Sequence, residues 1–177
     1  MHPLGRASSA TGLIVFSMAL AAEAPPLDVH TAMLTRVNTQ GLALWNITNK
    51  AIADDGSLDP GKLTTANWLQ LGEIGKALQN AGRDLARAQK PMAAPPGAKL
   101  QSEDNAGSTA ADVQRYLDAR PIEFRRHALQ LEHIGAGVVA AATRRDPKKL
   151  GDMANSLDGV CEGCHMIFWY PEQGKRK

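Results

Sequence analysis

The stretch Cys161-Glu162-Gly163-Cys164-His165 lies close to the end of the 177-residue chain. On a helix, residues three and four positions apart lie on one face, so Cys161, Cys164 and His165 project to the same side. Two thiols in this arrangement can add to the two vinyl groups of one haem, and the neighbouring imidazole can bind the iron. The pattern Cys-x-x-Cys-His therefore predicts the covalent attachment of a c-type haem.

Three other interpretations of these five residues remain open. The cysteines can form a redox dithiol, but such a pair usually begins a helix in a strand-and-helix pattern, which this sequence does not show. They can form half of a zinc site, but the chain has only these two cysteines, and its other histidines are scattered. The third interpretation is chance occurrence. We favour haem attachment because both cysteines of the chain lie inside the motif.

The first 21 residues have the features of a signal peptide. Arg6 gives a positive start, residues 10–22 form an apolar run, and Ala19-Leu20-Ala21 offers a cleavage site between small residues. The apolar run is too short to span a bilayer unaided, although an uncleaved anchor is the alternative. Cleavage leaves residues 22–177, the length of one ordinary domain, with no expected membrane segment.

The composition of the chain is balanced. Charged residues make up 21%, and the formal net charge is +2. Such a balance gives no indication of a nucleic-acid partner or of a strongly acidic one.

Apolar residues recur at steps of three and four in four segments, which predicts four amphipathic helices. Thr64 is a suitable N-cap for the second helix, and Pro121 suits the first turn of the third. Asp146 followed by Pro147 has the order expected at the start of the fourth. A shorter helix is expected to begin at Ser108 or Thr109 and to end at Ala119. The predicted long helices cover residues 27–53, 64–90, 121–144 and 147–171.

No segment has the pattern of a strand, so the sequence predicts an all-α protein, an antiparallel four-helix bundle. The haem motif then lies in the last two turns of the fourth helix and faces the core. Residues 91–108 are a long loop rich in proline, glycine and small polar residues; it either wraps around the domain or has a function of its own. The small residues 135–137 allow a neighbouring helix, or a flat cofactor, to approach closely.

A four-helix chain with Cys-x-x-Cys-His near its C-terminus resembles the cytochrome c′ family, the class II c-type cytochromes. The more familiar soluble cytochromes c carry this motif near the N-terminus. The resemblance is clearest over residues 124–161 and extends more loosely over the first two helices. Residues 161–173, Val37-Asn38 and Ala43-Leu44-Trp45 are similar to an exported branch of that family.

The resemblance implies one covalent haem c per chain, held through thioethers by Cys161 and Cys164, with His165 as the proximal iron ligand. It implies export to the periplasm, because bacterial c-type haem is attached outside the cytoplasm. Family members often pair through their first two helices, so the resemblance leaves a homodimer possible for this chain. The chain departs from the family at Trp169, where a basic residue is common. An aromatic residue packed against the proximal side of the haem would keep that side drier.

The function depends on the sixth position of the iron, which in this family faces the first helix. Met33, on the inward stripe of that helix, is the candidate ligand, and a role as core filler is the alternative. Arg36 is a candidate partner for a haem propionate, with plain surface exposure as the alternative. His30, one turn before Met33, would give bis-histidine ligation, but it is expected to be exposed at the helix start. His127 is expected to lie at the rim of the bundle and His133 to be solvated.

These features predict an exported monohaem cytochrome that passes single electrons between periplasmic redox proteins and has no catalytic residues of its own. The alternative is a five-coordinate haem protein that binds or senses nitric oxide or carbon monoxide. A third hypothesis, peroxide turnover, usually requires a distal histidine or arginine, and no distal histidine is evident from the sequence.

Overall fold

The computed structural model describes residues 26–100 and 108–171, and within these residues the regular elements are helical. The predicted all-α class is therefore confirmed for this part of the chain. The predicted signal peptide, residues 1–21, lies outside the described residues. The elements are α1 (Val29–Ala32), η1 (Met33–Val37), α2 (Asn38–Lys50), η2 (Pro60–Lys62), α3 (Thr65–Arg87), α4 (Ala110–Ala119), α5 (Pro121–Arg144) and α6 (Pro147–Phe168).

The first predicted helix consists of three consecutive elements, α1, η1 and α2. The Asp28 carboxylate caps its start by accepting a hydrogen bond from the Thr31 backbone N–H at 3.1 Å. Its middle part, η1, is a π-helix of five residues. Short π-helical sections inside α-helices occur frequently at functional sites. Val29, Val37 and Leu44 are buried, as the apolar stripe predicted.

The capping residues expected from the sequence define the other helix starts. The Thr64 hydroxyl accepts from the Asn67 N–H at 3.1 Å, and the Asn67 side chain accepts from the Thr64 N–H at 2.9 Å, which completes a capping box. Thr109 and Asp146 cap α4 and α6 through their side chains. Helix α5 has the predicted bounds, whereas α3 ends at Arg87, three residues before the predicted end.

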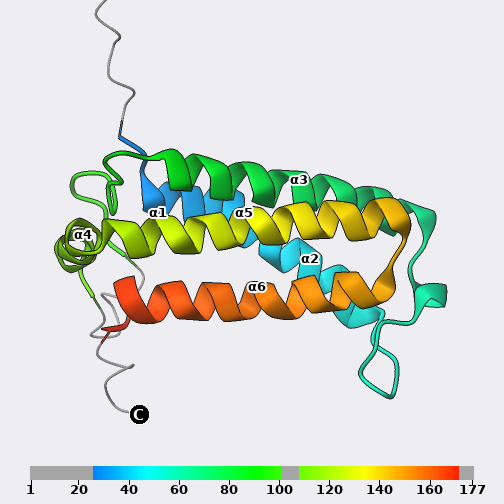
Figure 1. The fold of residues 1–177 in the computed structure, drawn as a ribbon. Helices are drawn as coiled ribbons and strands as arrows, with labels where there is room; N and C mark the ends of the chain where they lie inside the picture. Colours follow the sequence, from blue (N-terminus) through cyan, green and yellow to red (C-terminus); the bar gives the residue numbers. More distant parts are fainter. Residues whose placement is uncertain (1–25, 101–107, 172–177) are drawn as a thin grey trace, which may run out of the picture.

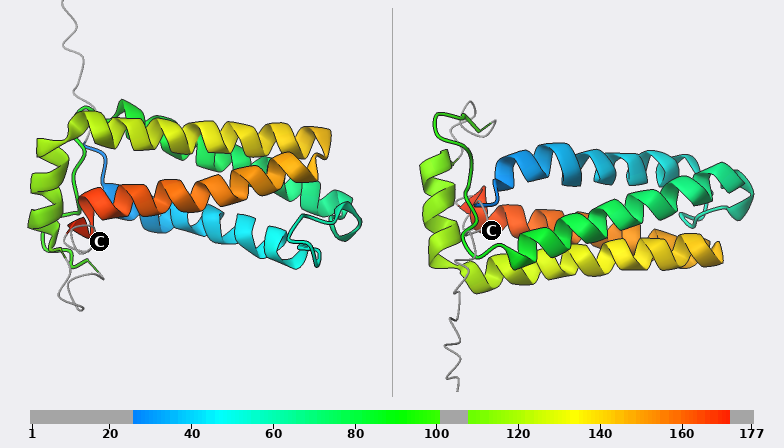
Figure 2. Two further views of the ribbon diagram at one scale, coloured as in Figure 1. Left: turned by 60° about the horizontal axis from the view of Figure 1, so that its bottom comes forward. Right: turned by 90° about the horizontal axis from the view of Figure 1, so that it is seen from above.

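Four long helical segments lie side by side, and the chain reverses direction from each to the next (Figures 1 and 2). Helix α3 packs on α5, α5 packs on α6, and α2 contacts both α3 and α6. The short helix α4 crosses one end of this arrangement (Figure 2). The fully buried core between the segments includes Leu44, Leu71, Val138 and Leu157. Among the described helices, none combines the length and apolar character needed to cross a membrane.

Glycines bring α3 and α5 into backbone contact. A Cβ at Gly75 would lie 2.8 Å from the Val139 backbone nitrogen, and one at Gly82 would lie 2.8 Å from the Ala128 carbonyl oxygen. A Cβ at Gly135 would meet the backbone of Gln79. Of the two roles predicted for residues 135–137, close approach of a helix is the one seen at Gly135.

We expect Gly82→Ala to destabilise the fold by about 1–3 kcal/mol, because the added methyl group can fit only if two backbones move apart. Gly72→Ala is the matched control on the same helix, since a Cβ there has nothing within 4 Å. The control should be neutral or stabilising by up to about 1 kcal/mol, the difference in helix propensity between alanine and glycine. Urea unfolding of both variants tests this, and equal stabilities would contradict the close backbone contact.

The described part of the long loop, residues 91–100, packs against the start of the first helical segment. The Val29 N–H donates to the Met92 carbonyl at 2.8 Å, and the His30 N–H donates to the Ala93 carbonyl at 3.1 Å. Ala93 and Leu100 are buried. The loop therefore wraps over the domain in this part, while residues 101–107 lie outside the described residues.

Candidate functional site

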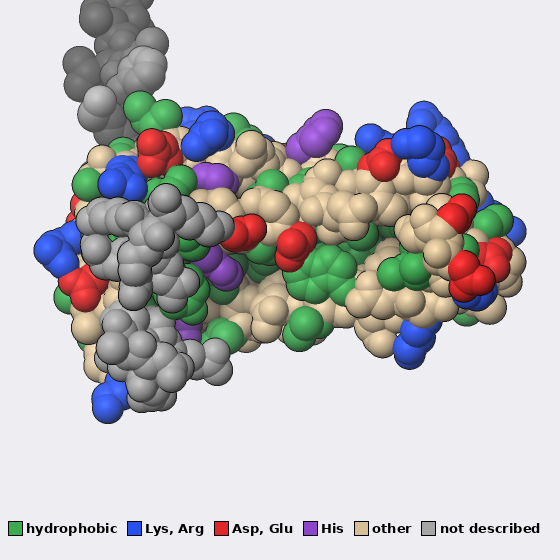
Figure 3. Space-filling view, turned by 90° about the horizontal axis from the view of Figure 1, so that it is seen from below, with side chains coloured by type: hydrophobic (Ala, Val, Ile, Leu, Met, Phe, Trp, Pro, Cys, Tyr) green, Lys and Arg blue, Asp and Glu red, His purple; other side chains and the backbone are tan. Residues whose placement is uncertain are grey.

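The Cys-x-x-Cys-His motif occupies the last two turns of α6. Cys161 and Cys164 are half-buried, unpaired with each other, and packed against the hydrophobic core, so the inward orientation predicted for the thiols is confirmed. His165 is more exposed and lies one position further around the helix. In Figure 3, histidine side chains gather with hydrophobic ones toward one end of the face seen from below.

Two adjoining cavities meet at this motif. The first, the outer cavity, has a volume of about 260 Å³ and lies between the α1–η1–α2 segment and α6. The second, the inner cavity, has about 40 Å³ and extends to α3 and α5. Both cavities are lined by Met33, Val37, Cys161 and His165. One thiol, the imidazole beside it and the predicted sixth ligand thus share one region of the structure.

Met33 begins the π-helical element η1 and is half-buried. It contributes to the walls of both cavities, on the opposite side from α6. The structure therefore brings Met33 to the motif, 128 residues earlier in the chain than Cys161, as the stripe on the first helix predicted. Its role as an iron ligand stays a prediction.

The sequence predicted that His127 lies at the rim of the bundle, and this prediction was wrong. His127, on α5, is buried, with 8% of its surface exposed. It lines the inner cavity together with both cysteines and His165. Neither ring nitrogen has a hydrogen-bond partner in the described structure. Burial, with a smaller effect from the Arg126 charge, lowers the pKa of His127, while Glu123 opposes the shift. A neutral imidazole with unpaired nitrogens faces the cavity, which is unusual for a buried polar group.

Gly163, between the two cysteines, makes room for this imidazole. A Cβ at Gly163 would lie 3.3 Å from Cε1 of His127, tighter than ordinary van der Waals contact. The helical period indicates the burial of His127, because His127 lies three residues after Phe124 and four before Leu131, both in the core.

In protein without haem, we expect His127→Leu to raise the free energy of unfolding by about 1–3 kcal/mol. The reason is that leucine removes two buried polar atoms that have no partner while nearly keeping the volume. His133→Leu, an exposed position on the same helix, is the control and should change stability by less than about 0.5 kcal/mol. Urea titrations followed by circular dichroism measure both. A less stable His127→Leu variant would mean that the imidazole has a partner.

Aromatic side chains surround His165. The ring centroids of His165 and Trp169 lie 6.2 Å apart at an interplanar angle of 51°. Tyr170 lies edge-on to the imidazole, also at 6.2 Å, and its N–H donates to the His165 carbonyl at 2.7 Å. Although part of the His165 side chain is exposed, the surrounding protein atoms desolvate its ring, which lowers its pKa and favours the neutral form that binds iron. Trp169 thus packs beside the predicted proximal ligand, whereas the contact of Tyr170 was not predicted.

Trp45 on α2 is a second residue that the sequence interpretation missed as part of the site. It lines the outer cavity, and its indole N–H donates to the Ala154 carbonyl on α6 at 3.2 Å. This hydrogen bond ties the two walls of the cavity together. The resemblance had included Ala43-Leu44-Trp45, but it assigned no role to the tryptophan.

Three other polar residues have varied outcomes. The Arg36 guanidinium forms an ion pair with Asp84 of α3 at 2.6 Å and does not line either cavity, so its role toward a propionate stays a prediction. His30 is half-buried and lines the outer cavity, which corrects the expectation that it is exposed. His133 is exposed, as predicted.

The pKa values of the two thiols bear on the redox-dithiol interpretation of the motif. Burial, with a smaller effect of Cys161, raises the pKa of Cys164 to about 12. Burial and the Asp158 carboxylate raise the pKa of Cys161 as well. Reactive redox dithiols have lowered pKa values, so these thiols do not resemble them. Within the described residues, no group of three or more His, Cys, Asp or Glu side chains gathers where it could hold a metal ion.

The residues present fit a covalently attached haem. A porphyrin holds iron through its own nitrogens, so the protein needs only one or two further ligands and two thiols. The adjoining cavities are largely apolar, contain both thiols, and present the unpaired imidazole of His127 toward the space between the helices. Comparisons with protein-family models, curated proteins and solved structures return no match to this chain.

Proposed function

We propose that the chain is a monohaem c-type cytochrome, related to the cytochrome c′ family and folded as an antiparallel four-helix bundle, that carries one electron at a time. The observation that supports this proposal best is the convergence of Cys161, His165 and Met33 on the same two cavities. When bound, the haem supplies an iron that alternates between the ferric and ferrous states. The protein supplies attachment, ligation and exclusion of water, and no catalytic residue is required.

Each residue of the site has a distinct part in the proposal. Cys161 and Cys164 would hold the haem through thioethers, and His165 and Met33 would be the side chains that bind its iron. Trp169 and Tyr170 cover the proximal imidazole, which limits the access of water and so affects the reduction potential. We propose further that residues 1–21 direct export, so that haem attachment and electron transfer take place in the periplasm with protein redox partners.

The binding or sensing of nitric oxide or carbon monoxide is the second candidate function. The inner cavity favours it, because its volume of about 40 Å³, bordered by Leu85, Phe124 and Leu131, exceeds the roughly 10–15 Å³ that one water molecule requires. In this case Met33 would be core filler, and the sixth position of the iron would be open.

Absorption spectra of the mature protein, made with haem-attachment machinery, distinguish the two functions. We expect a low-spin spectrum in the oxidised and reduced forms, and no change when carbon monoxide is added to the reduced form. A high-spin spectrum that changes promptly with carbon monoxide would favour gas binding instead.

A further inference from the structure

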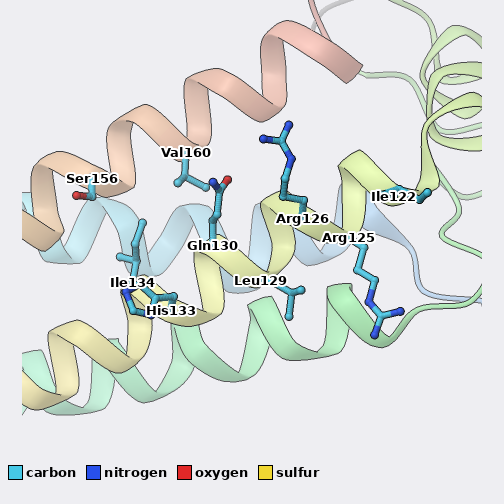
Figure 4. Close-up of a pocket in the computed structure, with 9 residues that line it drawn as sticks. All are labelled: Ile122, Arg125, Arg126, Leu129, Gln130, His133, Ile134, Ser156 and Val160. Carbon is cyan, nitrogen blue, oxygen red and sulfur yellow. The ribbon is translucent and has the colours of Figure 1, made fainter.

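A second, shallower groove runs along the outside of α5 and α6, about 550 Å³ in volume (Figure 4). In Figure 4, Arg126 extends from α5 toward α6, whereas Arg125 and Leu129 project from the other side of α5. Ile122 is 82% exposed and Leu129 is 46% exposed, which is high for large apolar side chains. Exposed apolar surface bordered by polar groups is typical of interaction sites.

The charge of this groove has one sign. Arg125 and Arg126 line it and are exposed, and neither has an ion-pair partner among the described residues. None of the residues lining the groove is acidic. Other cations of the described chain, such as Arg36 and Arg83, are neutralised by a carboxylate across a helix contact. The groove therefore presents an apolar surface with two positive charges that form no ion pair with any part of the chain that the structure describes.

Val160 connects this groove to the candidate haem site. Its side chain lines both the groove and the inner cavity, one helical turn before Cys164. Val160 thus lies between the groove and the cavity that Cys161 and Cys164 line. The exposed, charged groove therefore reaches α6 at the residue that immediately precedes the motif.

We propose that this groove is where the redox partner docks, and that the partner is a one-electron carrier protein with acidic residues around its contact surface. This inference rests on the proposed electron-transfer function. Carboxylates on the partner would be attracted by Arg125 and Arg126, which would increase the association rate and orient the partner over Val160. Apolar contact with Ile122 and Leu129 would then hold the short-lived complex together.

Two other occupants fit the groove less well. A second copy of the chain paired through the same groove would put the arginines of both copies into one interface whose lining holds no carboxylate, and like charges at an interface are unfavourable. An anionic membrane surface would match the charge, but a flat bilayer does not fill a hollow between two helices. A protruding protein surface satisfies both the charge and the shape.

The test is stopped-flow electron transfer from the reduced holoprotein to an acidic blue copper protein at several salt concentrations. For the natural sequence, we expect the second-order rate constant to fall as salt rises. The double variant Arg125→Glu/Arg126→Glu should lower the rate constant at low salt by about tenfold or more, and it should reverse the salt dependence. Arg125→Gln/Arg126→Gln should give an intermediate rate.

The matched control is Arg144→Glu/Lys149→Glu, which makes the same change in net charge at exposed positions near the other end of α5 and the start of α6. It should keep most of the natural rate. Equal losses in the two double variants would overturn the proposal, because net charge alone would then account for the effect. Dimerisation of the natural protein, or its binding to phosphatidylglycerol vesicles, would also overturn it if the groove variant abolished either.

The haem spectrum recorded before mixing separates this inference from the proposed function. Protein without haem absorbance would contradict the function itself. Protein with a normal spectrum and equal rates for all variants would contradict only the docking surface.

Discussion

Replacing Cys161 and Cys164 together by serine should abolish covalent haem attachment. Serine preserves the approximate size of each side chain, but its hydroxyl does not add to a haem vinyl group as a thiol does. Protein produced with haem-attachment machinery should therefore keep less than about a tenth of the covalent haem of the natural sequence, a more than tenfold loss. Intact mass under denaturing conditions, together with visible absorbance, measures the covalent haem.

Glu162→Gln is the control for the cysteine variant, because Glu162 lies inside the same motif and is exposed. The Glu162→Gln variant should retain full haem attachment, since Glu162 lines neither cavity. Each single cysteine variant should keep one thioether at most. Full attachment in the double serine variant would show that the haem is held in another way.

Replacing Met33 by alanine should open the sixth position of the iron. Before carbon monoxide is added, the spectrum of the ferrous protein should then be high-spin and no longer low-spin. The ferrous protein should also bind carbon monoxide. The reduction potential should fall on the order of 0.1 V, part of the roughly 0.8 V range over which axial ligands set it, because a thioether ligand raises the potential. Optical titration against redox mediators, with and without carbon monoxide, measures these changes.

Leu34→Ala is the matched control for Met33, because Leu34 is the next residue on η1 and is 44% exposed. It should leave the spin state and the potential unchanged. If Met33→Ala behaved like this control, Met33 would be core filler. Gas binding in the apolar inner cavity would then be the better supported function.

The helix boundaries could be predicted because they depend on local interactions. The capping box at Thr64 and the cap at Asp146 require residues only a few positions apart, so the sequence contains them completely. The π-helical section at residues 33–37 could not be predicted, since nothing in its local sequence differs from that of an ordinary helix. The backbone contact between α3 and α5 was predicted only as one option, because small residues do not identify what approaches them.

The site could be predicted where the residues form one motif, and less well where separate helices meet. Cys161 and Cys164 face inward and Met33 lies near them, as the sequence indicated. The rim prediction for His127 was wrong because it gave more weight to the two neighbouring arginines than to the helical period, which places His127 between the core residues Phe124 and Leu131. The contact of Tyr170 with His165 could not be predicted, because it depends on the path of the chain after α6 ends.

The most direct test of the central claim is the intact mass of the mature protein, purified from a host with haem-attachment machinery and measured under denaturing conditions. We predict a mass higher than that of the polypeptide by one haem, with the visible absorbance remaining on the protein after acidic organic extraction. A mass equal to the polypeptide alone, with all colour extracted or none present, would contradict the assignment of the Cys-x-x-Cys-His motif and the function built on it.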